Sequence, residues 1–292
     1  MTIHVISIGV NRSLADRSIP RLNYAEIDAS ANHRLWSEDL GCGDNAKLLV
    51  DAPSFQPHVR QAVDEVGRRV VAGDTFVLYF AGHGKVINGE PFCLLSQAEI
   101  APLEAGRTDS NDLLSISWLR QRVRTSWPRG VHLACIIDAC RTEIRTGTRG
   151  GGGMSELRKQ LEGYASRDPR IVQDRHAAGL ASPDDSDVGD IELYACPLGE
   201  QSHEFDPIGR GMVSFALENW LREGLLKGLP RVLDESLSEV LERGVDEIAR
   251  EHRRPSPGQR PVIQRNGAPV LLFNPGGMVV RLTRSQQDAV DG

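Results

Sequence analysis

Cysteine is scarce in this sequence, and its spacing excludes the usual roles of paired cysteines. The 292 residues include five cysteines, an odd number at irregular intervals. No two of them form a Cys-x-x-Cys pair, which is typical of zinc sites, and no even set indicates a disulfide framework. We therefore expect no metal site and no disulfides, and the cytoplasm, a reducing compartment, as the place where the chain works.

Long apolar runs and an excess of positive charge are also lacking. The net charge is −6, which argues against a general nucleic-acid binder. The amino-terminal segment MTIHVISIGV has neither the basic region nor the small-residue cleavage site of a signal peptide, and its apolar run is too short to cross a bilayer. The sequence therefore predicts no nucleic-acid partner and no membrane partner.

What the first half of the chain does contain is a regular alternation of short apolar runs and amphipathic stretches. Strands are expected at residues 3–10, 46–50, 75–80 and 131–138, with helices between them at 24–40, 55–71 and 115–124. The run 75–80 is apolar throughout after its threonine, as in a central parallel strand that is covered on both faces. This order predicts an α/β fold, a mostly parallel sheet with helices on both faces.

The pattern changes after residue 140. Residues 141–190 hold four consecutive glycines, scattered arginines and an acidic run at 183–187, and such a long irregular insert is typical of functional or disordered segments. Order is expected to return with strands at 191–195 and 270–273 and helices at 212–223 and 233–250. We predict one domain over residues 1–284, with a flexible linker at 141–190, followed by a polar tail at 285–292.

Two motifs carry the chemistry, and each directly follows a predicted strand. The first is Ala-Gly-His-Gly at 81–84, and the second is Asp-Ala-Cys-Arg at 138–141. Parallel sheets present their ligands just past the carboxyl ends of their strands, so His83 and Cys140 are expected to lie near each other in space. Taken singly, such a cysteine is more often a small buried residue, and such a histidine is more often the polar tip of a turn. Together they favour a functional site.

A cysteine and a histidine are the pair that thiol attack on a carbonyl requires. The Cys140 thiolate would be the nucleophile, and the His83 imidazole would protonate the leaving amine. The backbone N–H groups of Gly84 and Cys140 are predicted to form an oxyanion hole. Cys93 and Cys135 are expected in the core because they lie within apolar runs. No role is assigned to the other cysteines and to two further histidines, namely Cys42, Cys196, His132 and His203.

These motifs and their spacing resemble those of the caspase-like peptidases, in particular metacaspases and bacterial caspase homologues. The segment LNYAEIDASANHRLWSEDLGC resembles the one that leads into their first helix, and ELYACPLGEQSHEF with GMVSFALENWL resembles their fifth strand and following helix. GQRPVIQRNG resembles a segment near the end of the bacterial members. The resemblance implies a three-layer sandwich around a sheet of about six strands, and cysteine endopeptidase activity.

The resemblance also implies the kind of substrate. Caspases have glutamine two positions before the nucleophile, whereas this chain has Asp138, and a second acid of the metacaspase pocket falls on Asp28. Two carboxylates that face one slot select a guanidinium or ammonium group, so we expect cleavage after Arg, and also Lys, and not after Asp. Asp28 could equally be an acid that interacts with a helix dipole. For Asp138 the alternative is a turn residue at the end of its strand. Ala81 replaces the serine of the metacaspase pattern, so one pocket hydroxyl is missing.

In caspases and metacaspases the linker after the nucleophile is often cut during maturation. Basic residues in this linker are either self-cleavage sites or plain solvated surface, namely Arg145, Arg149, Arg158, Lys159, Arg167, Arg170 and Arg175. Metacaspases commonly need calcium, but the acidic run at 183–187 lacks the spacing of a calcium loop, so calcium dependence stays open and no cofactor is predicted. The resemblance implies an upstream activator protein and a bacterial stress or antiviral-defence pathway.

Two other functions stay open at the level of the sequence. One is a catalytically silent caspase-like scaffold that binds a partner protein, although the presence of both His83 and Cys140 argues against it. The other is a thiol hydrolase of small amides or esters. The acid pair Asp28 and Asp138 favours instead a protein substrate with a cationic side chain.

Overall fold

The computed structural model describes residues 1–51, 54–105, 107–108, 112–144 and 188–275. Its centre is a six-stranded sheet in the order β13-β9-β7-β3-β1-β2. The strands are β1 (Ile3–Gly9), β2 (Ala46–Val50), β3 (Thr75–Gly82), β7 (His132–Ala139), β9 (Asp190–Tyr194) and β13 (Val262–Asn266). Neighbouring strands run parallel except β13, which is antiparallel to β9. The prediction of a mostly parallel sheet of about six strands is confirmed.

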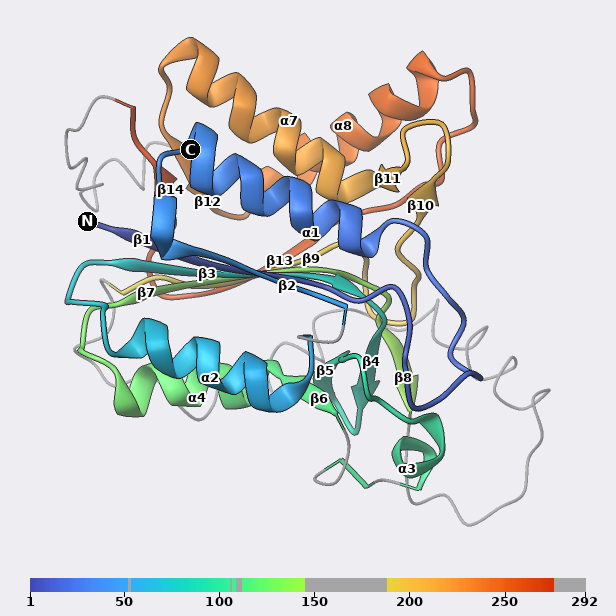
Figure 1. Ribbon diagram of the computed structural model, residues 1–292. Helices are drawn as coiled ribbons and strands as arrows, with labels where there is room; N and C mark the ends of the chain where they lie inside the picture. The colour runs from blue at the N-terminus through green and yellow to red at the C-terminus, as the bar shows by residue number, and fades with distance from the viewer. Residues whose placement is uncertain (52–53, 106, 109–111, 145–187, 276–292) are drawn as a thin grey trace.

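Helices cover both faces of this sheet (Figure 1). One face carries α1 (Ala25–Arg34), α7 (Met212–Lys227) and α8 (Leu237–Glu251), and the other face carries α2 (Gln56–Gly67) and α4 (Ile116–Ser126). The α1 helix continues into a short π-helix, η1 (Leu35–Asp39). This is the predicted three-layer sandwich. Among the helices of the described part of the chain, none is long and apolar enough to cross a membrane.

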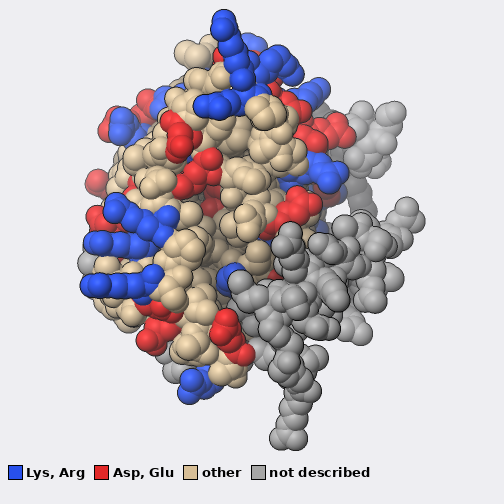
Figure 2. Space-filling view, turned by 90° about the vertical axis from the view of Figure 1, so that its right-hand side faces the viewer, with Lys and Arg blue, Asp and Glu red and all other residues tan. Residues whose placement is uncertain are grey.

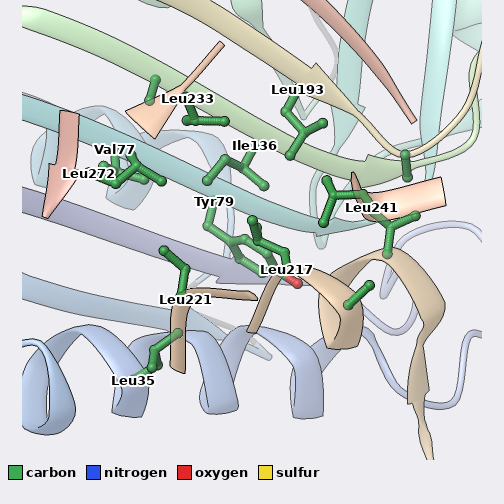
Figure 3. Packing of buried hydrophobic residues seen from close by; sticks show 14 of the residues in the cluster. Leu35, Val77, Tyr79, Ile136, Leu193, Leu217, Leu221, Leu233, Leu241 and Leu272 are labelled. Carbon is green, nitrogen blue, oxygen red and sulfur yellow. The ribbon is translucent and has the colours of Figure 1, made fainter. Parts of the chain in front are cut away.

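Two apolar clusters, one on each face of the sheet, hold the central strands in place. Every residue of β3 is buried, and its side chains alternate between the two faces. Tyr79 packs with Ile136 and Leu217 on the side of α7 (Figure 3), whereas Phe80 and Val63 belong to the cluster on the side of α2. Because close-packed interiors resist deformation, the carboxyl ends of β3 and β7 form a rigid edge.

A second sheet of four strands was not predicted. It runs in the order β6-β5-β4-β8 and consists of β6 (Leu113–Ser115), β5 (Glu90–Leu94), β4 (Gly84–Ile87) and β8 (Thr142–Ile144). β8 pairs in parallel with β4, which corrects the prediction of an irregular segment that begins at residue 141. Strands of this length are too short for a period to be recognised, and the partner of β8 lies far away in the sequence.

Two short ribbons and two short helices complete the described elements. The ribbons are β10 (Glu204–Phe205) with β11 (Arg210–Gly211) and β12 (Arg231–Leu233) with β14 (Val270–Phe273), and the helices are η2 (Gly43–Asn45) and α3 (Ile100–Glu104). The helix predicted at 233–250 begins only at Leu237, because residues 231–233 pair with β14. The predicted self-cleavage residues, the acidic run and the polar tail lie outside the described residues, namely Arg145, Arg149, Arg158, Lys159, Arg167, Arg170, Arg175, 183–187 and 285–292.

Candidate active site

The candidate nucleophile and its histidine directly follow the last paired residues of two neighbouring strands. Gly82 and Ala139 form the final pair of β3 and β7, so His83 and Cys140 are the next residue of each strand. Two residues after His83 and Cys140, pairing resumes between β4 and β8. The partners are again 57 positions apart in the sequence. Adjacent strands lie about 4.8 Å apart, so His83 and Cys140 follow neighbouring strand ends at the same level of the sheet.

A backbone carbonyl orients His83. The ring Nε2–H donates to the Pro20 carbonyl oxygen at 2.6 Å, which leaves Nδ1 to accept a proton. Burial lowers the pKa of His83 below its ordinary value, and the charge of Lys85 lowers this pKa further, so the ring is neutral near pH 7. Pro20 was not predicted, because the group it contributes is a carbonyl that every residue carries.

The Cys140 thiol is half-buried and neutral at rest. Burial is the main reason that its pKa lies above the ordinary value. The Ser202 N–H and the Lys85 ammonium act in the opposite direction, because both favour the thiolate. Since the thiol and the imidazole are both neutral, attack on a carbonyl requires that the Cys140 proton passes to His83 as the attack begins.

Gly84 lies against the backbone of Cys140. A Cβ at this position would come within 2.5 Å of the Cys140 carbonyl oxygen, so only glycine fits here without displacing that backbone. Leu94 N donates to the His83 carbonyl, and Gly84 therefore belongs to the next, non-hydrogen-bonded pair of the β4–β5 ladder. Its N–H points away from β5 and toward β8. The role of Gly84 and Cys140 as an oxyanion hole stays a prediction.

Lys85 is a member of the site that was not predicted. Its Nζ donates to Thr142 Oγ1 at 2.7 Å, which ties β4 to β8 just beyond the unpaired residues. Burial is the main cause that lowers the pKa of Lys85, whereas Cys140 raises this pKa. A lysine two positions after a histidine carries no signal in the sequence, since its proximity to Cys140 depends on the second sheet.

Replacing Lys85 with methionine is expected to shift thiolate formation at Cys140 to higher pH. The ammonium favours the charged thiolate, so its removal raises the pKa of the thiol further. The measurement is the rate of iodoacetamide alkylation of Cys140 as a function of pH. Lys47→Met is the matched control, because Lys47 pairs with Glu65 instead. Superimposable pH profiles for Lys85→Met and the wild type would contradict this electrostatic role.

The two acids predicted to select the substrate converge on one point. Asp28 on α1 and Asp138 at the end of β7 both face Gly211, where a Cβ would lie 2.9 Å and 2.7 Å from their Oδ2 atoms. They are 2% and 8% exposed, respectively. Burial first, and then the charge of Asp138, raises the pKa of Asp28 to about 7. On the face at the carboxyl ends of the strands, acidic side chains gather around the middle (Figure 2).

Serine hydroxyls orient Asp138. Ser202 Oγ donates to Oδ1 at 2.5 Å, and Ser214 donates to Oδ2 from its backbone N at 3.1 Å and also from its hydroxyl. The Tyr79 hydroxyl and Ser214 Oγ are 2.5 Å apart, so this network reaches into the core. Although Ala81 supplies no hydroxyl, two serine hydroxyls therefore surround Asp138. Neither serine was predicted, because both lie more than 60 residues away from Asp138.

Of the remaining cysteines, the buried Cys196 lies beside the site, where its thiol donates to the Ala139 carbonyl oxygen at 3.6 Å. Cys93 and Cys135 are fully buried, as expected for core residues, and burial raises the pKa of Cys135 to about 12. His132 lies at the opposite end of β7, where its Nδ1 accepts from Gly189 N, and His203 is exposed. Within the described residues, no group of three His, Cys, Asp or Glu side chains could hold a metal ion.

The comparisons with known proteins concern the family and the fold of the chain. A family model for the caspase domain, Peptidase C14, matches residues 10–269. The chain therefore belongs to the caspase-domain family of cysteine peptidases. Among solved structures it is similar to the protein GSU0716 from Geobacter sulfurreducens, with 17% sequence identity, a TM-score of 0.57, and coverage of 92% of this chain and 95% of that one. That likeness concerns the fold alone, and a comparison with curated proteins gives no match.

Proposed function

We propose that this chain is a cysteine endopeptidase that cleaves the peptide bond after arginine, and also after lysine. The observation that carries the proposal is that the carboxylates of Asp28 and Asp138 both face Gly211. Asp138 is the residue two positions before Cys140 in the chain. A guanidinium can bond to carboxylates in a bidentate manner, whereas the carboxylate of an aspartyl substrate would be repelled by the same two groups.

The reaction proposed here uses two side chains and two backbone groups. The Cys140 proton passes to His83 Nδ1 while Sγ forms a bond to the substrate carbonyl carbon, and the N–H groups of Gly84 and Cys140 stabilise the resulting oxyanion. His83 then protonates the nitrogen of the leaving amine as the C–N bond breaks. Water, deprotonated by His83, attacks the acyl-enzyme, and the thiol leaves with the proton restored.

Regulation and location belong to the same proposal. The family resemblance supports an upstream activator protein, or self-cleavage within residues 141–190, and a role in bacterial stress or antiviral defence in the cytoplasm. No cofactor is needed for the steps above. A requirement for calcium would show itself as loss of peptide cleavage in a chelator and its return on addition of Ca²⁺.

A panel of fluorogenic peptides that differ only in the residue before the cut tests the specificity. With Arg, Lys, Asp and Asn at that position, we expect the highest kcat/KM for Arg, by at least about 10²-fold over Asp. An aspartyl side chain cannot supply the positive charge that pairs with the buried carboxylates. A preference for Asp or Asn would overturn the specificity. Hydrolysis of small esters without peptide cleavage would favour a thiol hydrolase, and no turnover of any kind would favour a silent scaffold.

A further inference from the structure

An arginine of the chain itself is already paired with one member of the acid pair, Asp28. Arg210, the residue before Gly211, donates from Nε to Asp28 Oδ1 and from Nη2 to Glu218 Oε2, the latter at 2.8 Å. Its side chain is 11% exposed, and the partner carboxylates of Asp28 and Glu218 are 3% and 12% exposed. This is a largely desolvated ion pair at one of the two carboxylates to which a substrate guanidinium is proposed to bind.

Both oxygens of Asp28 are in use in this arrangement. Oδ1 accepts from Arg210, and Oδ2 accepts from the backbone N of Gly211 at 2.8 Å. A second guanidinium entering beside Arg210 would meet a carboxylate that is already paired, together with a like charge at short range. At low effective dielectric such repulsion is strong, so the two arginines exclude each other.

From this geometry we infer that Arg210 is an internal substitute for the substrate arginine, and that productive binding requires Arg210 to leave Asp28. The inference rests on the proposed cleavage after basic residues. In the resting state, Arg210 restricts entry to the acid pair and so limits the activity toward arginyl substrates. It is a specificity-determining residue that competes with the substrate.

The structure also offers a place for the displaced side chain. Arg210 lines a cavity of about 710 Å³, and Glu26, Asp51 and Glu218 line the same cavity. Among the described residues, neither Glu26 nor Asp51 forms an ion pair with a basic side chain. Burial, and next the charge of Asp51, raise the pKa of Glu26, whereas the charge of Arg21 lowers this pKa. A guanidinium that rotates away from Asp28 would find carboxylate partners here.

The test is the steady-state cleavage of an arginyl peptide by Arg210→Gln. Removing the competitor is expected to raise kcat/KM about tenfold, mainly through a lower KM. The reason is that the substrate no longer has to displace the charge-assisted hydrogen bond between Arg210 and Asp28. Arg222→Gln is the matched control, because Arg222 bonds to the same Glu218, at 2.9 Å, and does not contact Asp28. Its kcat/KM should stay within about twofold of the wild type.

Arg210→Lys keeps the experiment decisive if Arg210→Gln does not fold, which a thermal melt would show. Lysine keeps the charge but cannot bond to Asp28 and Glu218 at once, so a smaller rise in kcat/KM is expected. An unchanged or lower kcat/KM in the folded variants would mean that Arg210 only fixes α1 to α7, and the inference would fall. If the wild type and all variants fail to cleave arginyl peptides, the proposed function falls as well. If the wild type cleaves them and the variants do so no faster, the proposed function stands alone.

Discussion

Cys140→Ala is expected to abolish cleavage of arginyl peptides, with a fall in kcat of at least about 10⁴-fold. The side chain that forms the covalent bond is lost, and no other described thiol can replace it. Cys93, Cys135 and Cys196 are buried, and Cys42 lies toward the amino end of β2, away from the site. Continuous fluorescence with the arginyl substrate measures the effect. The fold should be kept, because Cys140 is only half-buried and loses a single sulfur atom.

Cys42→Ala is the matched control for this variant. Cys42 is also a half-buried free thiol, but it lies before η2, toward the amino end of β2, whereas the site follows the carboxyl ends of β3 and β7, so its removal should leave kcat unchanged. The same pair of variants tests self-cleavage. Fragments cut within residues 141–190 should form on incubation of the wild type and of Cys42→Ala, and not of Cys140→Ala. Activity that survives in Cys140→Ala would overturn the assignment of the nucleophile.

Asp138→Asn is expected to remove the preference for arginine. The change deletes the negative charge but keeps the size of the side chain, and a buried cation that loses its partner costs about 3 kcal/mol or more, which corresponds to about 10²-fold in kcat/KM. Cleavage after a neutral residue should change much less. The measurement is the ratio of kcat/KM for peptides with Arg and with Asn before the cut.

Asp206→Asn provides the control for charge alone. Asp206 is an exposed acid close to the same edge of the sheet, where it accepts a hydrogen bond from the Tyr24 hydroxyl at 2.9 Å. A surface charge of this kind should alter the Arg-to-Asn ratio by less than about twofold. An equal loss of selectivity in both variants would show that net charge, and not the pocket, sets the preference, and would contradict the role of Asp138.

The central sheet and the position of the candidate dyad were predictable because each leaves a local signal. The run 75–80 is apolar on both faces of its strand, and the motif with His83 follows it at once. The motif with Cys140 follows a second run of the same kind. Parallel strands align their carboxyl ends, so these two local signals were enough to place two distant residues side by side.

The supporting groups of the site could not be predicted, because their roles arise from contacts between distant segments. Arg210 reaches Asp28 across 182 positions, and Ser202 reaches Asp138 across 64. Neither residue lies in a motif that demands its side chain. Lys85 depends in the same way on β8, a strand of three residues with no period of its own. Such contacts follow from the packing of the whole fold and leave no trace in any single window of the sequence.

In both strand pairs, β3 with β7 and β4 with β8, the partners are 57 positions apart, and this limits which insertions and deletions the chain can accept. His83 and Cys140 occupy a short break in what is otherwise one parallel ladder, with paired residues before and after them. Deleting one residue from either segment would shift two sheets at once and turn every following side chain to the opposite face. Segments outside the ladder, such as the connection between α8 and β13, can gain or lose residues without moving the pair. The distance between the reacting groups is therefore set by the sheets and is independent of loop length.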